Sequence, residues 1–197
     1  MNVQSSPDST HVPLAERPTR ILKATLELVS EEGLTGFSIG KLAKRAASSS
    51  GIIYHYFESK DMLIHTLYKE VLAKSAFTLT DDNYALPPFE RLKTLWLNTF
   101  DFYTHHPQET IFLEQYKHSA YYSQRLPEAD APLERLITVF QADIARGVFK
   151  DLPLSVLQAM TLDVAISLAK GVVAGRVELD EATLHTVADT VCQSVLH

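Results

Sequence analysis

Cysteine is almost absent from this chain, which carries only Cys192 among its 197 residues. A single thiol cannot close an internal disulfide, so the composition suits a reducing compartment such as the cytoplasm. Long apolar runs are also missing, and the sequence therefore predicts no membrane-spanning helix. The first residues lack the basic flank and apolar core of a signal peptide. Because they are polar and contain proline, residues 1–16 are expected to form a disordered leader.

A net positive charge is lacking as well, since the chain carries a formal charge of −6. This argues against a protein that attracts nucleic acid over its whole surface. The charges are unevenly distributed, however: residues 17–69 hold eight Lys or Arg against five Asp or Glu, whereas residues 70–197 hold ten against seventeen. A basic segment on an acidic body attracts polyanions to one end of the molecule only.

Alternation of apolar and polar residues, the pattern of a half-buried strand, forms no convincing run. Apolar residues recur instead at helical spacing in about nine segments, so the predicted fold is all-α. Pro18 is expected to begin the first helix and Gly33 to end it. The pattern breaks at DDNYALPP, residues 81–88, which predicts a boundary between domains of residues 17–75 and 76–197. Five helices are predicted in the second domain, over residues 89–105, from Pro107 onward, and over residues 132–146, 153–173 and 180–195.

The stretch from Ser38 to Lys60, SIGKLAKRAASSSGIIYHYFESK, predicts two short helices joined by a tight turn. Ser38 and Ser49 are the expected N-caps, because a serine hydroxyl accepts hydrogen bonds from the free N–H groups of a helix start. Three residues of the second helix are expected to face the core, namely Ile53, Tyr56 and Phe57. Small, hydroxylic and aromatic side chains remain on the outer face: Ser50, Gly51, Ile52, Tyr54 and His55. Such an exposed face on the second helix is typical of a DNA-binding helix-turn-helix.

A lysine stands where the following helix begins, directly after its expected cap Ser59. A cation at a helix N-terminus is unfavourable in isolation, because that end of the helix dipole is positive. An external anion such as a phosphate, shared by Lys60 and the free N–H groups, would remove the penalty. The alternative is an ordinary solvated lysine.

The second domain is rich in aromatic residues with polar tips, a composition that suits a small-molecule pocket. Six of them are the candidate lining residues: Trp96, Phe100, Tyr103, Phe112, Tyr116 and Phe140. Plain core packing is the alternative for each. Three histidines, His105, His106 and His118, lack cysteine or carboxylate companions at ligand spacing, so a capping or polar-tip role is expected for them and no metal site.

The last two predicted helices carry apolar residues around more of their circumference than one buried face requires. Two copies of this pair can form a four-helix bundle with a two-fold axis, which predicts a homodimer. The alternative is an ordinary hairpin of core helices.

Three segments within residues 17–72 resemble the DNA-binding domain of the tetracycline-repressor (TetR) family: RILKATLELVSEEG, FSIGKLAKRA and GIIYHYFESKDML. The most specific part is the aromatic run from Tyr54 to Phe57 followed by Ser59 and Lys60. The resemblance implies a repressor of transcription that binds a palindromic operator as a homodimer and is released by a small-molecule effector. The implied DNA contacts are Ser38, Ser49, Ser50, Gly51, Ile52, Tyr54, His55 and Lys60. For Tyr54 and His55 the alternative is a surface aromatic pair.

Two departures from the family pattern concern the turn and the residue that follows it. Ala47 and Ser48 stand where a glycine and an apolar residue are common, so Ala47 must adopt a backbone geometry that glycine takes more readily. Ser50 stands where a lysine is common, which removes one phosphate contact. Both departures make the operator sequence hard to predict.

The mechanism that the resemblance implies couples two sites. An effector that binds the splayed dimer better would shift the population away from the spacing that fits two successive major grooves. We expect the helix that begins at Lys60 to transmit this change, with no cofactor besides the effector. The rival hypotheses are a small helical enzyme, for which no nucleophile or metal constellation can be assembled, and a helical adaptor, which would not need the basic segment.

Overall fold

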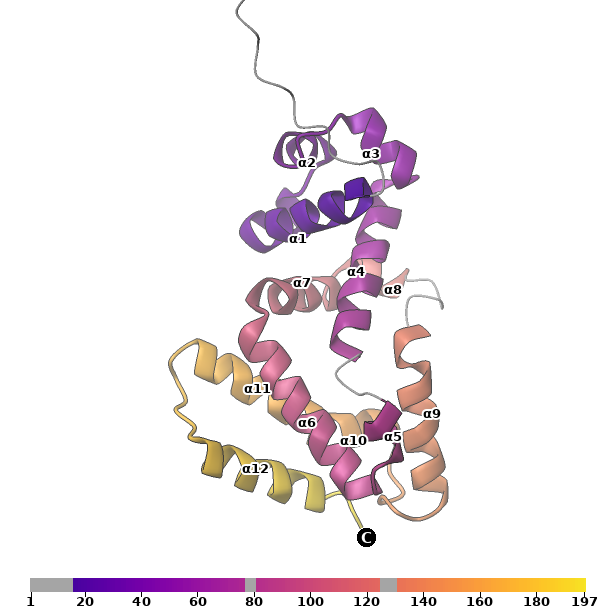
Figure 1. Cartoon of the computed structure of the whole chain (residues 1–197), viewed down its shortest axis with the longest axis vertical. Helices are drawn as coiled ribbons and strands as arrows, with labels where there is room; N and C mark the ends of the chain where they lie inside the picture. The colour runs from indigo at the N-terminus through magenta and orange to yellow at the C-terminus, as the bar shows by residue number, and fades with distance from the viewer. Residues whose placement is uncertain (1–15, 77–80, 125–130) are drawn as a thin grey trace, which may run out of the picture. The chain divides into compact units, whose positions relative to one another are not determined.

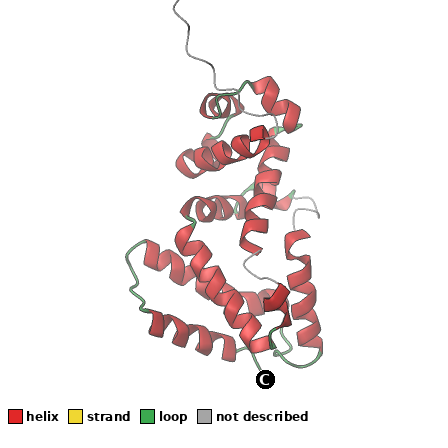
Figure 2. Ribbon diagram, viewed as in Figure 1, coloured by secondary structure: helices red, strands yellow, loops and turns green. Residues whose placement is uncertain are grey.

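The computed structural model describes residues 16–76, 81–124 and 131–197. Over these ranges the chain forms twelve helices, α1 to α12, and no strand beyond an isolated bridge between Phe149 and Leu196 (Figures 1 and 2). The predicted all-α fold is thus confirmed. There are more helices than the nine expected because α5 and α8 occupy connections and one predicted helix is divided in two. The predicted leader lies outside the described residues, apart from its last position. Contacts divide the chain into two compact units, Met1–Leu63 and Ile64–His197.

The first unit is built from α1 (Arg17–Gly36), α2 (Ile39–Arg45), α3 (Ser50–Tyr56) and the start of α4 (Lys60–Ala76). Pro18 occupies the first turn of α1, as predicted. Gly33 interrupts α1 with φ 78° and ψ 163°, a conformation open to a residue without Cβ. After this break Leu34 and Phe37 are both buried, as is Leu42 of α2.

The second unit contains the remainder of α4 and eight further helices. Their bounds are α5 Asp81–Ala85, α6 Pro88–His105, α7 Pro107–Lys117, α8 Ala120–Ser123, α9 Ala131–Ala145, α10 Leu154–Met160, α11 Leu162–Val173 and α12 Glu181–Gln193. Helix α6 is central, because α11 and α12 both pack along it (Figure 1). Ala165, Ala169 and Ala188 are fully buried, and their small side chains let these helices approach closely.

The helix predicted over residues 153–173 is divided at Thr161, which has φ −119° and ψ −79°. The hydroxyl of Thr161 donates to the carbonyl oxygen of Leu157 at 2.7 Å, the acceptor that its own N–H would use in a regular helix. That N–H donates instead to Gln158, three residues back. Taken as one segment, Leu154–Val173 has the length and mean hydropathy, 1.5, to cross a membrane. The break at Thr161 and the packing of α11 on α6 instead make it part of the second unit, and the absence of a membrane span stays a prediction.

Residues expected to form a boundary include the short helix α5. Arg91 of α6 fixes the end of this segment by donating to the carbonyl oxygens of Tyr84, at 3.1 Å, and Leu86, at 2.9 Å. The same guanidinium is ion-paired with the buried Asp143 of α9, which also accepts from Arg146. The sequence pattern missed α5 because a side chain of the next helix holds its end in place. The predicted limits of the domains at residues 75 and 76 stay a prediction.

Candidate functional sites

Two serine caps begin the short helices of the first unit, as predicted from the sequence. The Ser38 hydroxyl accepts from the N–H of Lys41 at 3.3 Å, and the Ser49 hydroxyl accepts from the N–H of Ile52 at 3.2 Å. Each cap satisfies a backbone donor that the first helical turn would leave unpaired. The helix-turn-helix therefore has sharply defined starts for both α2 and α3.

The turn between them depends on Ala47, which has φ 44° and is the one non-glycine residue with positive φ in the described part of the chain. The expectation that this alanine takes a glycine-like conformation is therefore confirmed. The turn is closed by a hydrogen bond of 2.9 Å from the Ser48 N–H to the Ala43 carbonyl oxygen. A left-handed alanine costs about 1–2 kcal/mol, so the surrounding contacts impose this geometry.

The outward residues of α3 form the surface that would meet a partner. Ile53 is fully buried and anchors the helix, while Tyr54 is 48% exposed. Ser50, Gly51 and His55 are exposed too, and Ile52 is half-buried. A Cβ added at Gly51 would meet only the Ser49 hydroxyl, at 3.9 Å. The fold therefore does not demand glycine there, and the space in front of it is open to an external group.

Some basic residues of the first unit are neutralised by ion pairs within that unit. Arg45 of α2 donates to both carboxylate oxygens of Glu31 in α1, at 3.0 and 2.6 Å, and this contact lowers the pKa of Glu31. Lys41 pairs with Glu32 at 2.5 Å. The ammonium group of Lys44 makes no ion pair or hydrogen bond with any residue that the structure describes. The sequence counts of charge missed this pairing because it joins residues nine to fourteen positions apart.

Lys60 is held within the first unit. Its ammonium group donates to the carbonyl oxygen of Phe37 at 3.0 Å and lies 5.2 Å from the centroid of the Phe37 ring. Ser59 caps α4 as predicted, by accepting from the N–H of Met62 at 3.1 Å. A lysine ammonium has three donors, so two remain for another acceptor. An external phosphate was one explanation that the sequence offered for a cation at this helix start. The contact with Phe37 supplies part of that stabilisation from within the protein.

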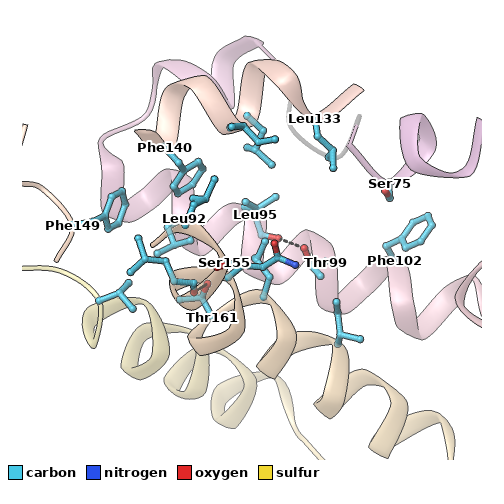
Figure 3. Close-up of a pocket in the computed structure, with 18 of the residues that line it drawn as sticks. Ser75, Leu92, Leu95, Thr99, Phe102, Leu133, Phe140, Phe149, Ser155 and Thr161 are labelled. Atoms are coloured by element: carbon cyan, nitrogen blue, oxygen red, sulfur yellow. Dashed lines mark hydrogen bonds between the residues drawn. The ribbon is translucent and has the colours of Figure 1, made fainter. Parts of the chain in front are cut away.

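A cavity of about 410 Å³ lies in the second unit (Figure 3). Its walls come mainly from α6, α9, α10 and α11. The apolar lining residues are Leu92, Leu95, Phe102, Leu133, Leu136, Ile137, Phe140, Phe149, Leu154, Leu157, Leu162, Ile166 and Val195. The polar lining residues are Ser75, Thr99, Tyr103, Ser155, Gln158 and Thr161. Its size and mainly apolar lining are typical of a small-molecule site.

Only two of the six aromatic residues proposed from the sequence, Tyr103 and Phe140, line this cavity. Trp96 and Phe100 follow directly after the lining residues Leu95 and Thr99, about 100° further around α6, and therefore pack into the core instead. The sequence identified the right helix but not its cavity-facing side. Helical spacing alone was the available signal, and it cannot tell a core face from a cavity face.

Phe112 and Tyr116 also lie outside the cavity lining, because α7 uses them in a separate buried cluster. The Tyr116 hydroxyl lies 2.8 Å from Nδ1 of His65, which α4 contributes. Tyr68 stacks on Tyr116 with ring centroids 4.1 Å apart. Aromatic content in this domain therefore reflects packing as well as a cavity.

The histidines at the end of α6 serve the helix terminus. Nδ1 of His105 lies 3.0 Å from the Asp101 carbonyl oxygen, and Nδ1 of His106 lies 3.1 Å from that of Phe102. Both side chains thus satisfy carbonyl groups at the C-terminal end, which supports the capping role predicted for them. Within the ranges that the structure describes, no three His, Cys, Asp or Glu side chains gather as a metal-ligand group.

Comparison with known proteins matches both units. Residues 21–67 match the family model of bacterial regulatory proteins, tetR family, and residues 87–196 match the tetracyclin repressor-like C-terminal domain. An uncharacterized HTH-type transcriptional regulator of Haemophilus influenzae is 35% identical over 99 residues, which cover 50% of this chain and 53% of that protein. The HTH-type transcriptional repressor NicS of Pseudomonas putida is 29% identical over 143 residues, which cover 66% of this chain and 65% of that protein. The matches thus span about half to two thirds of these relatives.

Solved structures share the fold over nearly the full length. A TetR-family transcriptional regulator from Haemophilus influenzae superposes with a TM-score of 0.77 at 26% identity, covering 93% of this chain and 98% of that one. A TetR-family regulator from Marinobacter aquaeolei superposes with a TM-score of 0.81 at 21% identity, covering 92% of this chain and 96% of that one. The relatives named in these comparisons are transcriptional regulators rather than enzymes.

Proposed function

The chain belongs to the tetracycline-repressor family of transcriptional regulators, and we propose on that basis that it represses transcription in the cytoplasm by binding a palindromic DNA operator through α2 and α3. The geometry of α2, Ala47 and α3 is the observation that supports this most directly. It combines two capped helices with a fixed turn and an outer face that the core does not use. In helix-turn-helix proteins, the second helix of such a pair enters the major groove.

Each residue of the outer face has a proposed role. Ser50 can exchange hydrogen bonds with several bases, Gly51 permits close approach, and Ile52 can touch a thymine methyl group. Sugar-phosphate contacts are proposed for Ser38, Ser49, Tyr54, His55 and Lys60. Phosphate contacts position a protein on DNA, whereas base contacts select the sequence.

We propose that the active form is a homodimer joined through α11 and α12, with α10 adjoining. Only 28% of the apolar segment Leu154–Val173 is buried within the chain. Val156, Met160 and Val173 are large apolar side chains that stay exposed on it. A two-fold axis through such a surface would pair the same residues of both copies. The two α3 helices would then have to lie about 34–36 Å apart to reach successive major grooves.

The cavity of the second unit is the proposed effector site, and no further cofactor is proposed. Ser75 in the last turn of α4 lines the cavity, and Lys60 begins the same helix. An effector that fits one position of α4 better would shift the dimer away from the spacing of the operator. The effector can shift the equilibrium between the two states only by the difference in its binding free energy for them, typically about 1–3 kcal/mol.

A gel-shift experiment with DNA that flanks the protein's own gene tests the DNA-binding function. The unmodified chain should bind, and the double variant Tyr54→Ala/Lys60→Ala should lose binding because it removes two proposed phosphate contacts. Ile111→Ala, which truncates an exposed apolar residue of α7, is the matched control and should bind normally. Retained binding by the double variant would refute the assigned interface. No binding by the unmodified chain would favour the adaptor alternative.

A further inference from the structure

We propose that the ligand of the cavity is an uncharged, mainly apolar molecule with a hydrogen-bond donor, such as an alcohol or a phenol, and that Gln158 is its specificity-determining contact. The inference rests on the proposed function only in treating this cavity as the effector site. The chemistry of the ligand follows from the walls alone.

The walls offer no compensation for a charged ligand. Among the lining residues that the structure describes, thirteen are apolar and six are polar but uncharged, with no Asp, Glu, Lys, Arg or His among them. An ion that enters an apolar site loses its hydration, and without an opposite charge this costs several kcal/mol. A neutral ligand avoids that loss and gains from burying apolar surface.

Tyr103 is the one ionisable group among the described residues of the wall, and it is neutral at physiological pH. Burial, and to a smaller extent the carboxylates of Glu114 and Asp163, raise the pKa of its phenol to about 12. The phenol therefore stays protonated and acts as a donor or acceptor without charge. The negative potential of these carboxylates also disfavours an anionic ligand near Tyr103, although Glu114 is itself paired with Lys170.

The positive charge of Arg91, which lies near another part of the wall, is already paired. The Arg91 guanidinium lies 5.8 Å from the centroid of the Phe140 ring, which lines the cavity. That guanidinium is already bound to Asp143 and to two carbonyl oxygens. Because Asp143 already supplies its counter-charge within the protein, this guanidinium does not favour an anionic ligand.

Two of the wall hydroxyls favour a ligand that donates a hydrogen bond. Thr99 donates its proton to the Leu95 carbonyl oxygen at 2.7 Å (Figure 3), and Thr161 donates to that of Leu157 at 2.7 Å. A hydroxyl has a single proton, so these two can offer only acceptor lone pairs toward the cavity. A ligand O–H or N–H would satisfy them, whereas an acceptor-only ligand would not.

Gln158 is the wall residue best able to select among such ligands. It lies one helical turn after Ser155 on the cavity side of α10. Its side-chain amide makes no hydrogen bond with the residues that the structure describes, and it is exposed, so its replacement should leave the fold intact. An uncharged amide can both donate and accept, and a carboxylate at the same position would favour a cation instead.

Isothermal titration calorimetry on the full chain tests the proposal with three probes that share one ring system. They are 1-naphthalenemethanol, 1-naphthoate and 1-naphthylmethylammonium. The neutral alcohol should bind at least about tenfold more tightly than either ion. In Gln158→Glu, the ammonium probe should gain at least about tenfold, and Gln108→Glu on the exposed surface of α7 should leave its binding unchanged.

Equal or tighter binding of an ion to the unmodified chain would overturn the proposal, as would binding of none of the three probes. An unchanged ammonium affinity in Gln158→Glu would remove Gln158 from its assigned role. A gel shift of the same sample without probe tests the proposed DNA-binding function separately from the ligand class. If that sample fails to bind DNA, the proposed function fails while the calorimetric result on ligand class stands.

Discussion

The indole nitrogen of Trp96 donates a 3.1 Å hydrogen bond to the carbonyl oxygen of Thr161, the residue that separates α10 from α11. Trp96 is fully buried on α6, and Thr161 forms part of the cavity wall. One side chain thus links the central helix of the second unit to the helix break beside its cavity.

Replacement of Trp96 by Phe keeps an aromatic ring but removes this donor. The free energy of unfolding should fall by about 1–3 kcal/mol, because the indole bond is lost and part of the buried volume is left empty. Urea denaturation followed by circular dichroism measures the change. Tyr54→Phe, which removes an exposed hydroxyl, serves as the control, and equal stability of both variants would contradict the role of Trp96.

Ala47→Gly should raise the free energy of unfolding by up to about 1 kcal/mol. Glycine relieves the strain of φ 44°, and the gain is partly offset because glycine is more flexible in the unfolded chain. Thermal denaturation of the two proteins provides the comparison. The matched variant Ala46→Gly alters a buried neighbour with negative φ and should lower stability; a loss of stability in both would show that the turn is unstrained.

Lys44 and Lys41 should differ in their contribution to DNA binding. In the described part of the chain Lys44 is free of ion pairs, whereas Lys41 is paired with Glu32. Lys44→Gln is therefore expected to reduce the slope of log Kd against log salt by about 0.9, the effect of one phosphate contact. Lys41→Gln should change that slope much less. Fluorescence anisotropy with operator DNA over a salt series gives both slopes, and the opposite order would rule out the charge pairing as the deciding factor.

Asp143→Asn should lower the free energy of unfolding by about 3–5 kcal/mol. Asp143 is fully buried between Arg91 and Arg146, and its neutralisation leaves the buried Arg91 without its counter-charge. Guanidinium denaturation measures the loss. Asp101→Asn, which alters an exposed carboxylate on α6, should be nearly neutral, and a similarly small effect at Asp143 would mean that its ion pairs contribute little.

Cys192 should resist thiol reagents in the folded protein. The residue is buried, and burial raises the pKa of its thiol to about 12, so the reactive thiolate is scarce at pH 8. Ellman's reagent should label it slowly in buffer and rapidly in urea. Rapid labelling of the folded chain would indicate that α12 opens far more readily than its packing implies.

Local features of the fold could be predicted from the sequence. Ser38, Ser49, Ser59 and Asp180 mark helix starts because a cap bonds to a backbone group only a few residues away. The strained turn at Ala47 was predicted from the family resemblance, because glycine is common at this position of the turn. Each of these features depends on neighbours in the chain.

The remaining features depend on contacts between distant residues. The pairing of Arg45 with Glu31 joins α2 to α1, and the buried pairing of Arg91 with Asp143 joins α6 to α9. The cavity wall is set by the direction in which α6 faces α9 and α10, so the choice between Trp96 and Leu95 as a lining residue could not be made from spacing. Among the proposed DNA contacts, the caps are confirmed as caps, while the contacts themselves stay a prediction.

The position of Lys60 has a consequence for the entropy of binding. Immobilising a free lysine side chain costs up to about 2 kcal/mol in rotamer freedom. Lys60 is already immobilised by the carbonyl oxygen and ring of Phe37, so most of that loss occurs on folding. Lys44 still has its rotamer freedom to lose. A phosphate bound by Lys60 would therefore meet a pre-ordered cation, and the start of α4 would act as a rigid reference point for aligning α3 on DNA.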